Sequence, residues 1–348
     1  MSNDEVRSIN LALQGGGSHG AFTWGVLDRL LEDGRVSFEG ISATSAGAMN
    51  AVVYAYGKMR GGSDGARQAL HDFWQRVSAS AAPYSPLALT PVEKMFGVLP
   101  EQSWSYVAVE SLTRTFSPYQ LNPLNLNPLR DVLAACVDFD ELKRCAGSKL
   151  FLSATNIRTG NVRVFGTEEI GIEAVLASAC LPFLFQAIEI DGAFYWDGGY
   201  MGNPSLFPLF YNTDSRDVVV VHINPIFCAD IPKSAAEIAD RVNEITFNSA
   251  LLKEFRAIAF VTKLLEDGWI KDEYRAKLRH MLIHSIRADD ALNTLGAASK
   301  ANCDWRFLTD LRDRGRATAE RWLVENYIHL GKRATVDLVS EYLNPGRK

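Results

Sequence analysis

The sequence predicts an α/β fold with a mainly parallel central sheet, followed by a helical C-terminal region. Two observations carry this prediction. A strand–loop–helix–strand–turn–helix unit occupies residues 8–57, and such units build parallel sheets with right-handed crossovers. The segment DVVVVHINP, from Asp217, has the continuous apolar run that is typical of a strand buried on both faces.

The first unit supplies five elements in order. They are a strand at 8–13, a glycine loop at 15–20, a helix with apolar residues at helical spacing that stops at Gly34, a strand at 38–43, and an alanine-rich helix from Ser45 to Gly57. Residues 58–130 are less regular. GGSDG at 61–65 is predicted to be a loop, and the segments SAAPYSPLALTP and SPYQLNPLNLNPLR are expected to be extended, either covering a pocket or serving as buried connections.

The next elements are two hairpins and a short helix between them. RTGN carries turn chemistry inside residues 149–166, and Asp191-Gly192 is the signal for the second hairpin. Residues 173–179 are expected to be helical. From about residue 232 apolar residues recur at helical spacing, which predicts an α/β domain over 1–230 and a helical region over 231–348.

Composition excludes some functions and compartments. The net charge of −5 lacks the basic footprint of a nucleic-acid-binding protein. Five cysteines without a CxxC pair favour a reducing compartment. No signal peptide is evident, and the 15 uncharged residues between Glu173 and Glu189 fall short of the roughly 20 that a spanning helix needs. We therefore expect a cytoplasmic protein whose membrane contact is peripheral, with no cofactor and no metal site.

The glycine loop GGGSHG, at residues 15–20, predicts an anion site. Glycines allow a sharp turn, and a helix start offers unpaired N–H donors for a phosphate or a developing oxyanion. A tight turn that needs glycine only for packing is the alternative. Gly15, Gly17 and Gly20 also fit the dinucleotide pattern GxGxxG, but no acidic residue ends the second strand and no GK[ST] closes the loop.

A candidate nucleophile follows the second strand. ATSAG, at residues 43–47, is one residue away from the GxSxG pattern that presents a serine, here Ser45, at a sharp turn. A turn of small residues with Ser45 as the helix N-cap is the alternative. The glycine loop one β–α unit earlier favours the nucleophile, because both loops would lie at the same edge of a parallel sheet.

A candidate base lies in WDGGY, where Asp197 sits on a tight turn. A serine hydroxyl needs such a base to become nucleophilic. A simple Asp-Gly turn is the alternative, but Asp191-Gly192 already supplies the hairpin turn, which favours a chemical role for Asp197.

Two histidines are candidates for further members of the site. Ser45, Asp197 and His222 follow the chain order of an α/β-hydrolase triad. His222, however, falls inside an apolar strand, so we expect it to be structural. His19 lies inside the glycine loop within reach of a substrate, but we assign it no role as a base.

These motifs resemble the patatin-like phospholipase family. Four segments match in order: GGGSHGAF, ATSAG, ASACLP at 177–182 and DGGYMGNP at 197–204. They span residues 8 to about 225, and their combination and order make the resemblance specific. The resemblance implies a three-layer patatin-like body.

The resemblance also implies a function. It implies a serine carboxylic ester hydrolase of the phospholipase or lipase type, acting on lipid esters at a membrane or lipid surface through a Ser–Asp dyad. Ser45 would form an acyl-enzyme, and Asp197 would accept its proton and then activate water. The oxyanion would be held by backbone N–H groups of Gly16 and Gly17, together with Gly15 and Ser18.

The sequence departs from the family pattern at two positions, and it leaves two alternative functions open. Ala43 replaces the usual glycine, and His19 stands where Arg or Lys is common, which weakens the attraction for a lipid phosphate. The other functions are a nucleotide- or phosphate-binding protein that uses the glycine loop, and a lipase scaffold that a partner activates.

Overall fold

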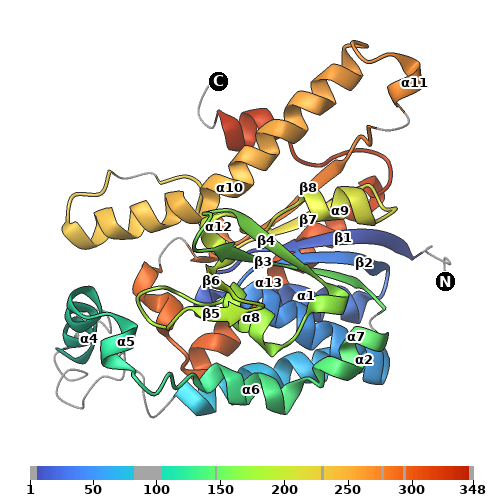
Figure 1. Cartoon of the computed structure of the whole chain (residues 1–348). Coiled ribbons are helices and arrows are strands. Elements are labelled where there is room, and N and C mark those ends of the chain that lie inside the picture. The colour runs from blue at the N-terminus through green and yellow to red at the C-terminus, as the bar shows by residue number, and fades with distance from the viewer. Residues whose placement is uncertain are drawn as a thin grey trace.

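The computed structural model describes residues 6–81, 104–145, 147–228, 231–275, 278–292 and 295–344. In these ranges the protein is built on an eight-stranded sheet in the order β5–β6–β3–β2–β1–β7–β8, with β4 paired to β3 off this path (Figure 1). The strands are β1 (Arg7–Leu13), β2 (Val36–Ala43), β3 (Lys149–Asn156), β4 (Val162–Gly166), β5 (Ile188–Ile190), β6 (Ala193–Asp197), β7 (Asp217–His222) and β8 (Leu282–Arg287).

The sheet is mostly parallel, which confirms the predicted fold class. Strands β3, β2, β1, β7 and β8 run parallel to one another, whereas β4 and β6 pair antiparallel with β3, and β5 pairs antiparallel with β6. Leu13 at the end of β1 is in register with Ala43 of β2 and Val221 of β7. The carboxyl ends of these three strands therefore meet at one edge of the sheet.

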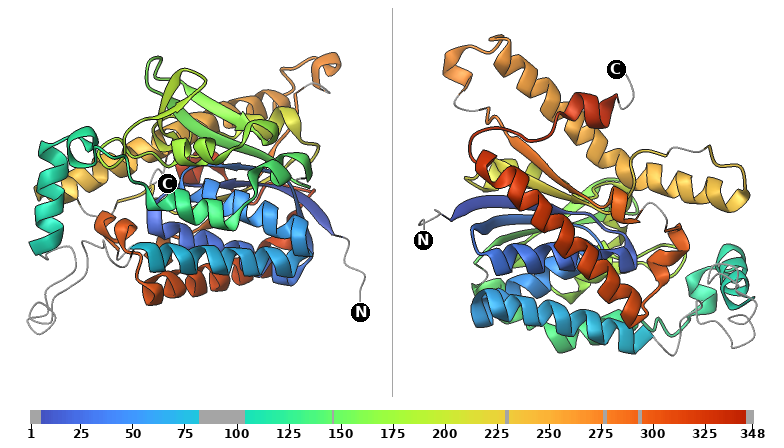
Figure 2. Two further views of the ribbon diagram at one scale, coloured as in Figure 1. Left: turned by 60° about the horizontal axis from the view of Figure 1, so that its bottom comes forward. Right: turned by 180° about the vertical axis from the view of Figure 1, so that it is seen from behind.

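Helices cover both faces of the sheet (Figures 1 and 2). One layer contains α1 (Gly20–Asp33), α2 (Ala46–Ala81), α6 (Pro128–Cys136), α7 (Phe139–Cys145) and α13 (Trp305–Asn326). The other contains α9 (Phe207–Asn212), α10 (Ala235–Glu266) and the terminal helical turn η8 (Val339–Leu343). The remaining α-helices are α4 (Trp104–Thr115), α5 (Pro118–Leu121), α8 (Ile172–Ser178), α11 (Asp272–Arg275) and α12 (Asp289–Leu292). No helix in the described ranges is long and apolar enough to span a bilayer.

Strand β7 shows why its sequence is continuously apolar. Val219 and Val221 belong to the core beneath the sheet with α1 and α2, whereas Val218 and Val220 pack with Phe255 of α10 on the other face. Since successive side chains of a strand point to opposite faces, a strand covered on both sides has no solvent-facing position.

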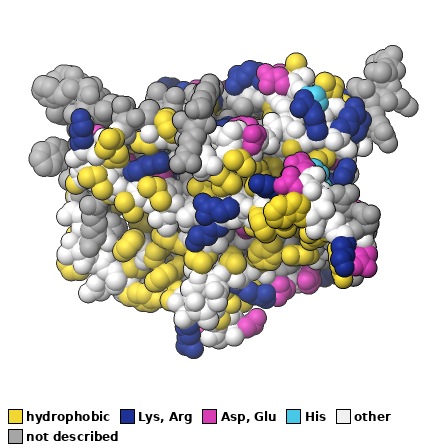
Figure 3. Space-filling view, turned by 90° about the horizontal axis from the view of Figure 1, so that it is seen from above, with side chains coloured by type: hydrophobic (Ala, Val, Ile, Leu, Met, Phe, Trp, Pro, Cys, Tyr) yellow, Lys and Arg dark blue, Asp and Glu magenta, His cyan; other side chains and the backbone are white. Residues whose placement is uncertain are grey.

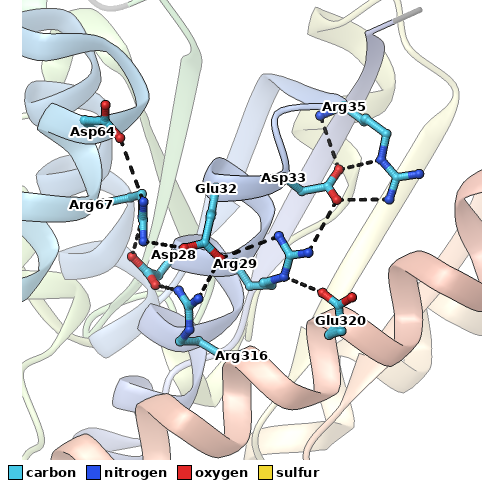
Figure 4. A network of polar contacts seen from close by, with 9 residues as sticks. All are labelled: Asp28, Arg29, Glu32, Asp33, Arg35, Asp64, Arg67, Arg316 and Glu320. Carbon is cyan, nitrogen blue, oxygen red and sulfur yellow. Dashed lines mark hydrogen bonds and ion pairs between the residues drawn. The ribbon is translucent and has the colours of Figure 1, made fainter. Parts of the chain in front are cut away.

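Helix α13 ties the C-terminal region to the body. Glycines allow α1 and α13 to cross closely, because a Cβ on Gly25 would lie 1.9 Å from the Arg312 carbonyl oxygen and one on Gly315 would lie 2.1 Å from that of Phe22. A network of ion pairs surrounds this crossing (Figure 4). In it Arg316 of α13 pairs with Asp28 of α1, and Arg67 of α2 donates to the same carboxylate at 2.8 Å.

The structure corrects two predictions in the middle of the chain. The helix that starts after Ser45 does not end at Gly57 but runs to Ala81, and GGSDG is a kink inside it, with Gly61 and Gly62 outside helical φ/ψ. The segment at 117–130 contains helix α5 and the start of α6, so it is only partly extended. SAAPYSPLALTP lies outside the described residues from residue 82 onward.

The C-terminal region is mainly helical, as expected, but it also contributes strand β8 to the sheet edge beside β7. The apolar pattern of this region predicts helices only, so this strand was not expected from the sequence. The division of the chain at residue 230 remains a prediction.

Candidate active site

Three loops meet at the carboxyl edge of the sheet. Residues 14–16 follow β1 and lead into the short 3₁₀ turn η1 (Gly17–His19), Thr44 and Ser45 follow β2, and the turn η5 (Gly198–Tyr200) follows β6. The Thr44 hydroxyl donates to the Gly202 carbonyl oxygen at 2.6 Å. Segments far apart in the sequence thus form one site, as the two loop motifs predict.

Ser45 lies on a strained, sharp turn. Its φ is +55°, a conformation uncommon for a residue other than glycine, and its side chain is 8% exposed. The helix α2 starts directly behind it and approaches β1 so closely that a Cβ on Gly47 would lie 2.4 Å from the Leu13 carbonyl oxygen. This contact explains the glycine that ends ATSAG.

The departure at Ala43 is accommodated by the core. Ala43 is fully buried in the hydrophobic cluster beneath the sheet and pairs in register with Leu152 of β3. Its methyl group therefore has a packing role, and the turn at Ser45 forms with Ala43 in place.

Asp197 is fully buried at the end of β6. Its Oδ1 accepts the Gly199 N–H at 2.7 Å, whereas its Oδ2 is buried with no partner of regular hydrogen-bond geometry among the described residues. Burial raises the pKa of the Asp197 carboxyl to about 7, and the Gly199 N–H and the nearby Ser45 hydroxyl act in the opposite direction. The structure thus brings Ser45 and Asp197 together and gives the carboxyl an acceptor oxygen without a firm partner.

The glycine loop supplies fewer free amides than the sequence suggests. The Gly15 N–H already donates to the Asn203 side chain at 2.7 Å, so the expectation that Gly15 donates to an oxyanion is not met in this conformation. Gly16, Gly17 and Ser18 line the same cavity as Ser45. They remain the candidate donors.

A cavity of about 420 Å³ contains Ser45 and Asp197. Most of its wall is apolar and comes from α2, α6 and the segment after α8; these residues are Met49, Phe73, Trp74, Val77, Leu129, Leu181, Leu184 and Phe185. A larger cavity of about 680 Å³ lies between α9 and α10, but none of the candidate site residues line it. The smaller cavity therefore holds the candidate chemistry.

Neither histidine is placed to serve Ser45. His222 is buried at the end of β7, where its Nε2 lies 3.2 Å from the Tyr342 hydroxyl. His19 lies 2.7 Å through Nε2 from the Ser299 hydroxyl and does not line the cavity. Burial lowers the pKa of each imidazole to about 3, so both are neutral at pH 7.

Sequence reasoning missed the residues that hold the site in place. The Ser45 N–H donates to the Ser178 hydroxyl at 2.9 Å, and the Asp197 N–H donates to the Cys180 carbonyl oxygen at 2.8 Å. Ser178 and Cys180 both lie in ASACLP, so the match of this segment to the family was the available signal. Asn203, in DGGYMGNP, is a further buried residue that contacts the glycine loop.

Comparison with known proteins identifies the family. The sequence model described as "Patatin-like phospholipase" matches residues 11–210, which include the end of β1, both loop motifs and the turn at Asp197. The chain belongs to the patatin-like phospholipase family. Membership of this family makes the protein a lipid hydrolase. The matched residues end before β7, so the α10, β8 and α13 part of this patatin-like protein lies outside the family match.

Two solved structures are similar to this patatin-like protein at low sequence identity. VipD from Legionella pneumophila is 14% identical, with 92% of this chain and 67% of that chain covered and a TM-score of 0.38. The heterodimeric ExoU–SpcU complex from the type III secretion system of Pseudomonas aeruginosa is also 14% identical, with 94% of this chain and 78% of that chain covered and a TM-score of 0.31. Similarity at this level assigns neither a substrate nor a partner to this chain. No curated protein matches the sequence.

Proposed function

We propose that this patatin-like protein hydrolyses lipid acyl esters with a Ser45–Asp197 dyad. The observation that carries the proposal is the buried Asp197 carboxyl beside Ser45, with Oδ2 short of a hydrogen-bond partner. A hydroxyl needs an acceptor for its proton, and the two histidines that the motifs raised as candidates lie elsewhere.

The proposed reaction has two steps. Ser45 Oγ attacks the ester carbonyl while its proton passes to Asp197, and the alkoxide leaving group departs as the alcohol after it takes up that proton. Water then gives a proton to Asp197 and attacks the acyl-enzyme, which releases the fatty acid and returns the proton to Ser45. The N–H groups of Gly16, Gly17 and Ser18, residues that line the cavity with Ser45, are the proposed donors to the developing oxyanion.

The cavity wall favours an acyl chain as the occupant. Aromatic and aliphatic side chains from α2, α6 and the segment after α8 form most of the wall, and burial of a chain there is worth about 0.8 kcal/mol per methylene group. An apolar wall around Ser45 suits a lipid ester better than a nucleotide. The nucleotide-binding alternative therefore receives no support from this site.

Exposed apolar side chains surround the approach to the cavity. Phe183 is 69% and Leu184 47% exposed, and Leu184 also lines the cavity. The neighbouring segment carries Leu124 and Leu126, exposed by 79% and 66%, and it is held by the bond from Gln186 Nε2 to the Asn122 carbonyl oxygen at 2.8 Å. We infer that this apolar rim contacts the surface of a lipid aggregate.

Helix α10 adds to this surface. Ile238, Val242 and Ile245 are about half exposed at helical spacing, and the N-terminal half of α10 lies at the same end of the molecule as α5 (Figures 1 and 2). On the face that α10 covers, hydrophobic side chains are interspersed with charged ones (Figure 3). Such a mixed surface fits peripheral contact with lipid headgroups.

The test is an activity assay on p-nitrophenyl butyrate and on phospholipid vesicles. Ser45→Ala and Asp197→Asn should each lose at least about a thousandfold in kcat, as removal of a nucleophile or its base does in hydrolases. Asp191→Asn is the matched control, because Asp191 occupies an exposed hairpin turn six residues earlier and asparagine tolerates its φ of +52°. His222→Ala should retain most of the activity.

Two outcomes would contradict the proposal. If folded His222→Ala is as inactive as Ser45→Ala, a triad replaces the dyad. If the wild type hydrolyses neither substrate and Ser45 resists a fluorophosphonate, the site is not a serine hydrolase.

A further inference from the structure

Lys300 brings a positive charge into the catalytic cavity from outside the family match. It lies in the 3₁₀ turn η6 (Ala297–Ala301), between β8 and α13, and it lines the cavity with Ser45 and Gly16. Its backbone presses against the glycine loop, since a Cβ on Gly17 would lie 2.4 Å from the Lys300 carbonyl oxygen. The His19–Ser299 bond holds the same turn in place.

The Lys300 ammonium has an incomplete set of partners. Nζ donates to the neutral Asn224 Oδ1 at 2.9 Å, and no carboxylate of the described residues lies within ion-pair distance of it. Glu244 and Asp240 of α10 raise the pKa of this amine from a longer range, but its burial lowers the pKa more. A partly buried cation with only a neutral partner gains stability when an anion binds.

The fold places this charge on the side of the glycine loop away from Ser45. Asn224 follows β7, and its Nδ2 donates to the Gly15 carbonyl oxygen at 2.7 Å. Ser45 follows β2, and β1 with its glycine loop lies between β2 and β7 in the sheet. Ser45 and Asn224, the partner of Lys300 Nζ, thus follow strands two positions apart in the sheet, roughly 10 Å. This separation suits a substrate group several bonds away from the ester, and the oxyanion lies closer to the loop amides.

We propose that Lys300 forms an anion subsite of the catalytic cavity that binds the phosphate of a phospholipid headgroup. This inference rests on the proposed ester hydrolysis at Ser45. An ester whose acyl chain occupies the apolar wall extends its headgroup past the glycine loop toward Nζ. Lysine binds phosphate as a point charge, so the subsite selects phosphate-bearing esters over neutral ones without reading the rest of the headgroup.

The first arm of the test is a comparison of two monomeric substrates, dihexanoyl phosphatidylcholine and p-nitrophenyl butyrate. In Lys300→Met the ratio of kcat/KM for the phospholipid to that for the neutral ester should fall about tenfold, mainly through KM. Lys300→Arg keeps the charge and should retain more of this ratio than Lys300→Met. Lys253→Met is the control, because Lys253 is an exposed lysine of α10 that lines the other cavity, and its ratio should equal that of the wild type.

The second arm measures binding without turnover. Dodecyl phosphate should bind the Ser45→Ala protein at least about tenfold more tightly than the Ser45→Ala/Lys300→Met protein. Inorganic phosphate should compete only weakly, which distinguishes a lipid phosphate from the free ion. This arm decides the role of Lys300 even if the wild type hydrolyses neither ester and the proposed function fails.

Equal affinity of both proteins for dodecyl phosphate overturns the subsite. An equal loss of kcat/KM on both esters in folded Lys300→Met also overturns it, because the charge would then act on the reacting ester itself. Tight binding of inorganic phosphate alone would instead make the site a free-phosphate site.

Discussion

At the scale of single residues, the ionisation of Asp197 controls the proposed chemistry. Burial disfavours the carboxylate, whereas the Gly199 N–H and the Ser45 hydroxyl favour it, and burial prevails, so the pKa rises to about 7. Only the ionised form accepts the Ser45 proton. A base with a pKa near the working pH combines a useful ionised fraction with a strong affinity for the proton.

The pH dependence follows directly. Above pH 7 Asp197 is ionised and kcat/KM should be at its plateau; as the pH falls below 7, the ionised fraction and kcat/KM should fall about tenfold per unit. His19 and His222 cannot cause this limb, because burial lowers their pKa values to about 3. The measurement is a kcat/KM profile on p-nitrophenyl butyrate from pH 5 to 9. A profile that is level from pH 5 to 7 would show that Asp197 is not the base.

The sequence predicts the candidate site residues that lie in turn motifs, and it misses those that only long-range contacts bring to the site. Ser45 and Asp197 lie in glycine-rich turns whose local sequence reveals a strained or tight backbone. Lys300 lies in the C-terminal region, whose sequence predicts helices and carries no motif. Its turn reaches the glycine loop through long-range contacts, such as the pairing of β8 with β7, which the local sequence does not show. The Gly15 N–H looked available because its partner, Asn203, is distant in sequence.

At the scale of elements, the kink in α2 distinguishes two adjacent glycines. Gly61 has φ −151° and ψ 25°, outside the main allowed regions but at a negative φ, whereas Gly62 has φ +64° and ψ −150°, a region that is nearly exclusive to glycine. A Cβ on either glycine would meet no atom within 4 Å. Backbone conformation is therefore the main difference between the two sites.

This pair gives a matched stability test. Gly62→Ala should lower the free energy of unfolding by about 1–3 kcal/mol through backbone strain, whereas Gly61→Ala should lower it less, because its φ is negative. Urea unfolding followed by circular dichroism measures both. Equal effects of the two substitutions would show that α2 does not have this kink in solution. The sequence indicated the break at GGSDG but could not show that the helix resumes, because Gly-rich segments also form loops.

At the scale of the whole molecule, the C-terminal region packs against the α/β body and contributes to its sheet and to the wall of the candidate cavity. It supplies β8 at the sheet edge, α13 against α1, and the turn with Lys300 in the cavity wall. Sequence periodicity identified the helices of this region. It did not identify the strand, because pairing with β7 is a long-range contact and the local pattern does not show it.

A fragment experiment tests this integration. Residues 1–230 alone would expose the β7 edge and the face of α1 that Gly315 approaches in the intact chain. We expect this fragment to aggregate or to unfold without cooperativity, measured by light scattering and urea titration, while the full chain unfolds cooperatively. A monomeric, folded and active 1–230 fragment would instead support the division into two independent domains.

Mass spectrometry of the protein after reaction with a fluorophosphonate tests the Ser45–Asp197 dyad without a natural substrate. The dyad predicts a single covalent adduct that peptide mapping places on Ser45, absent in Ser45→Ala and formed at least about a hundredfold more slowly in Asp197→Asn. His222→Ala should be labelled at nearly the wild-type rate. An adduct on another residue, or unchanged labelling in Asp197→Asn, would contradict the Ser45–Asp197 dyad.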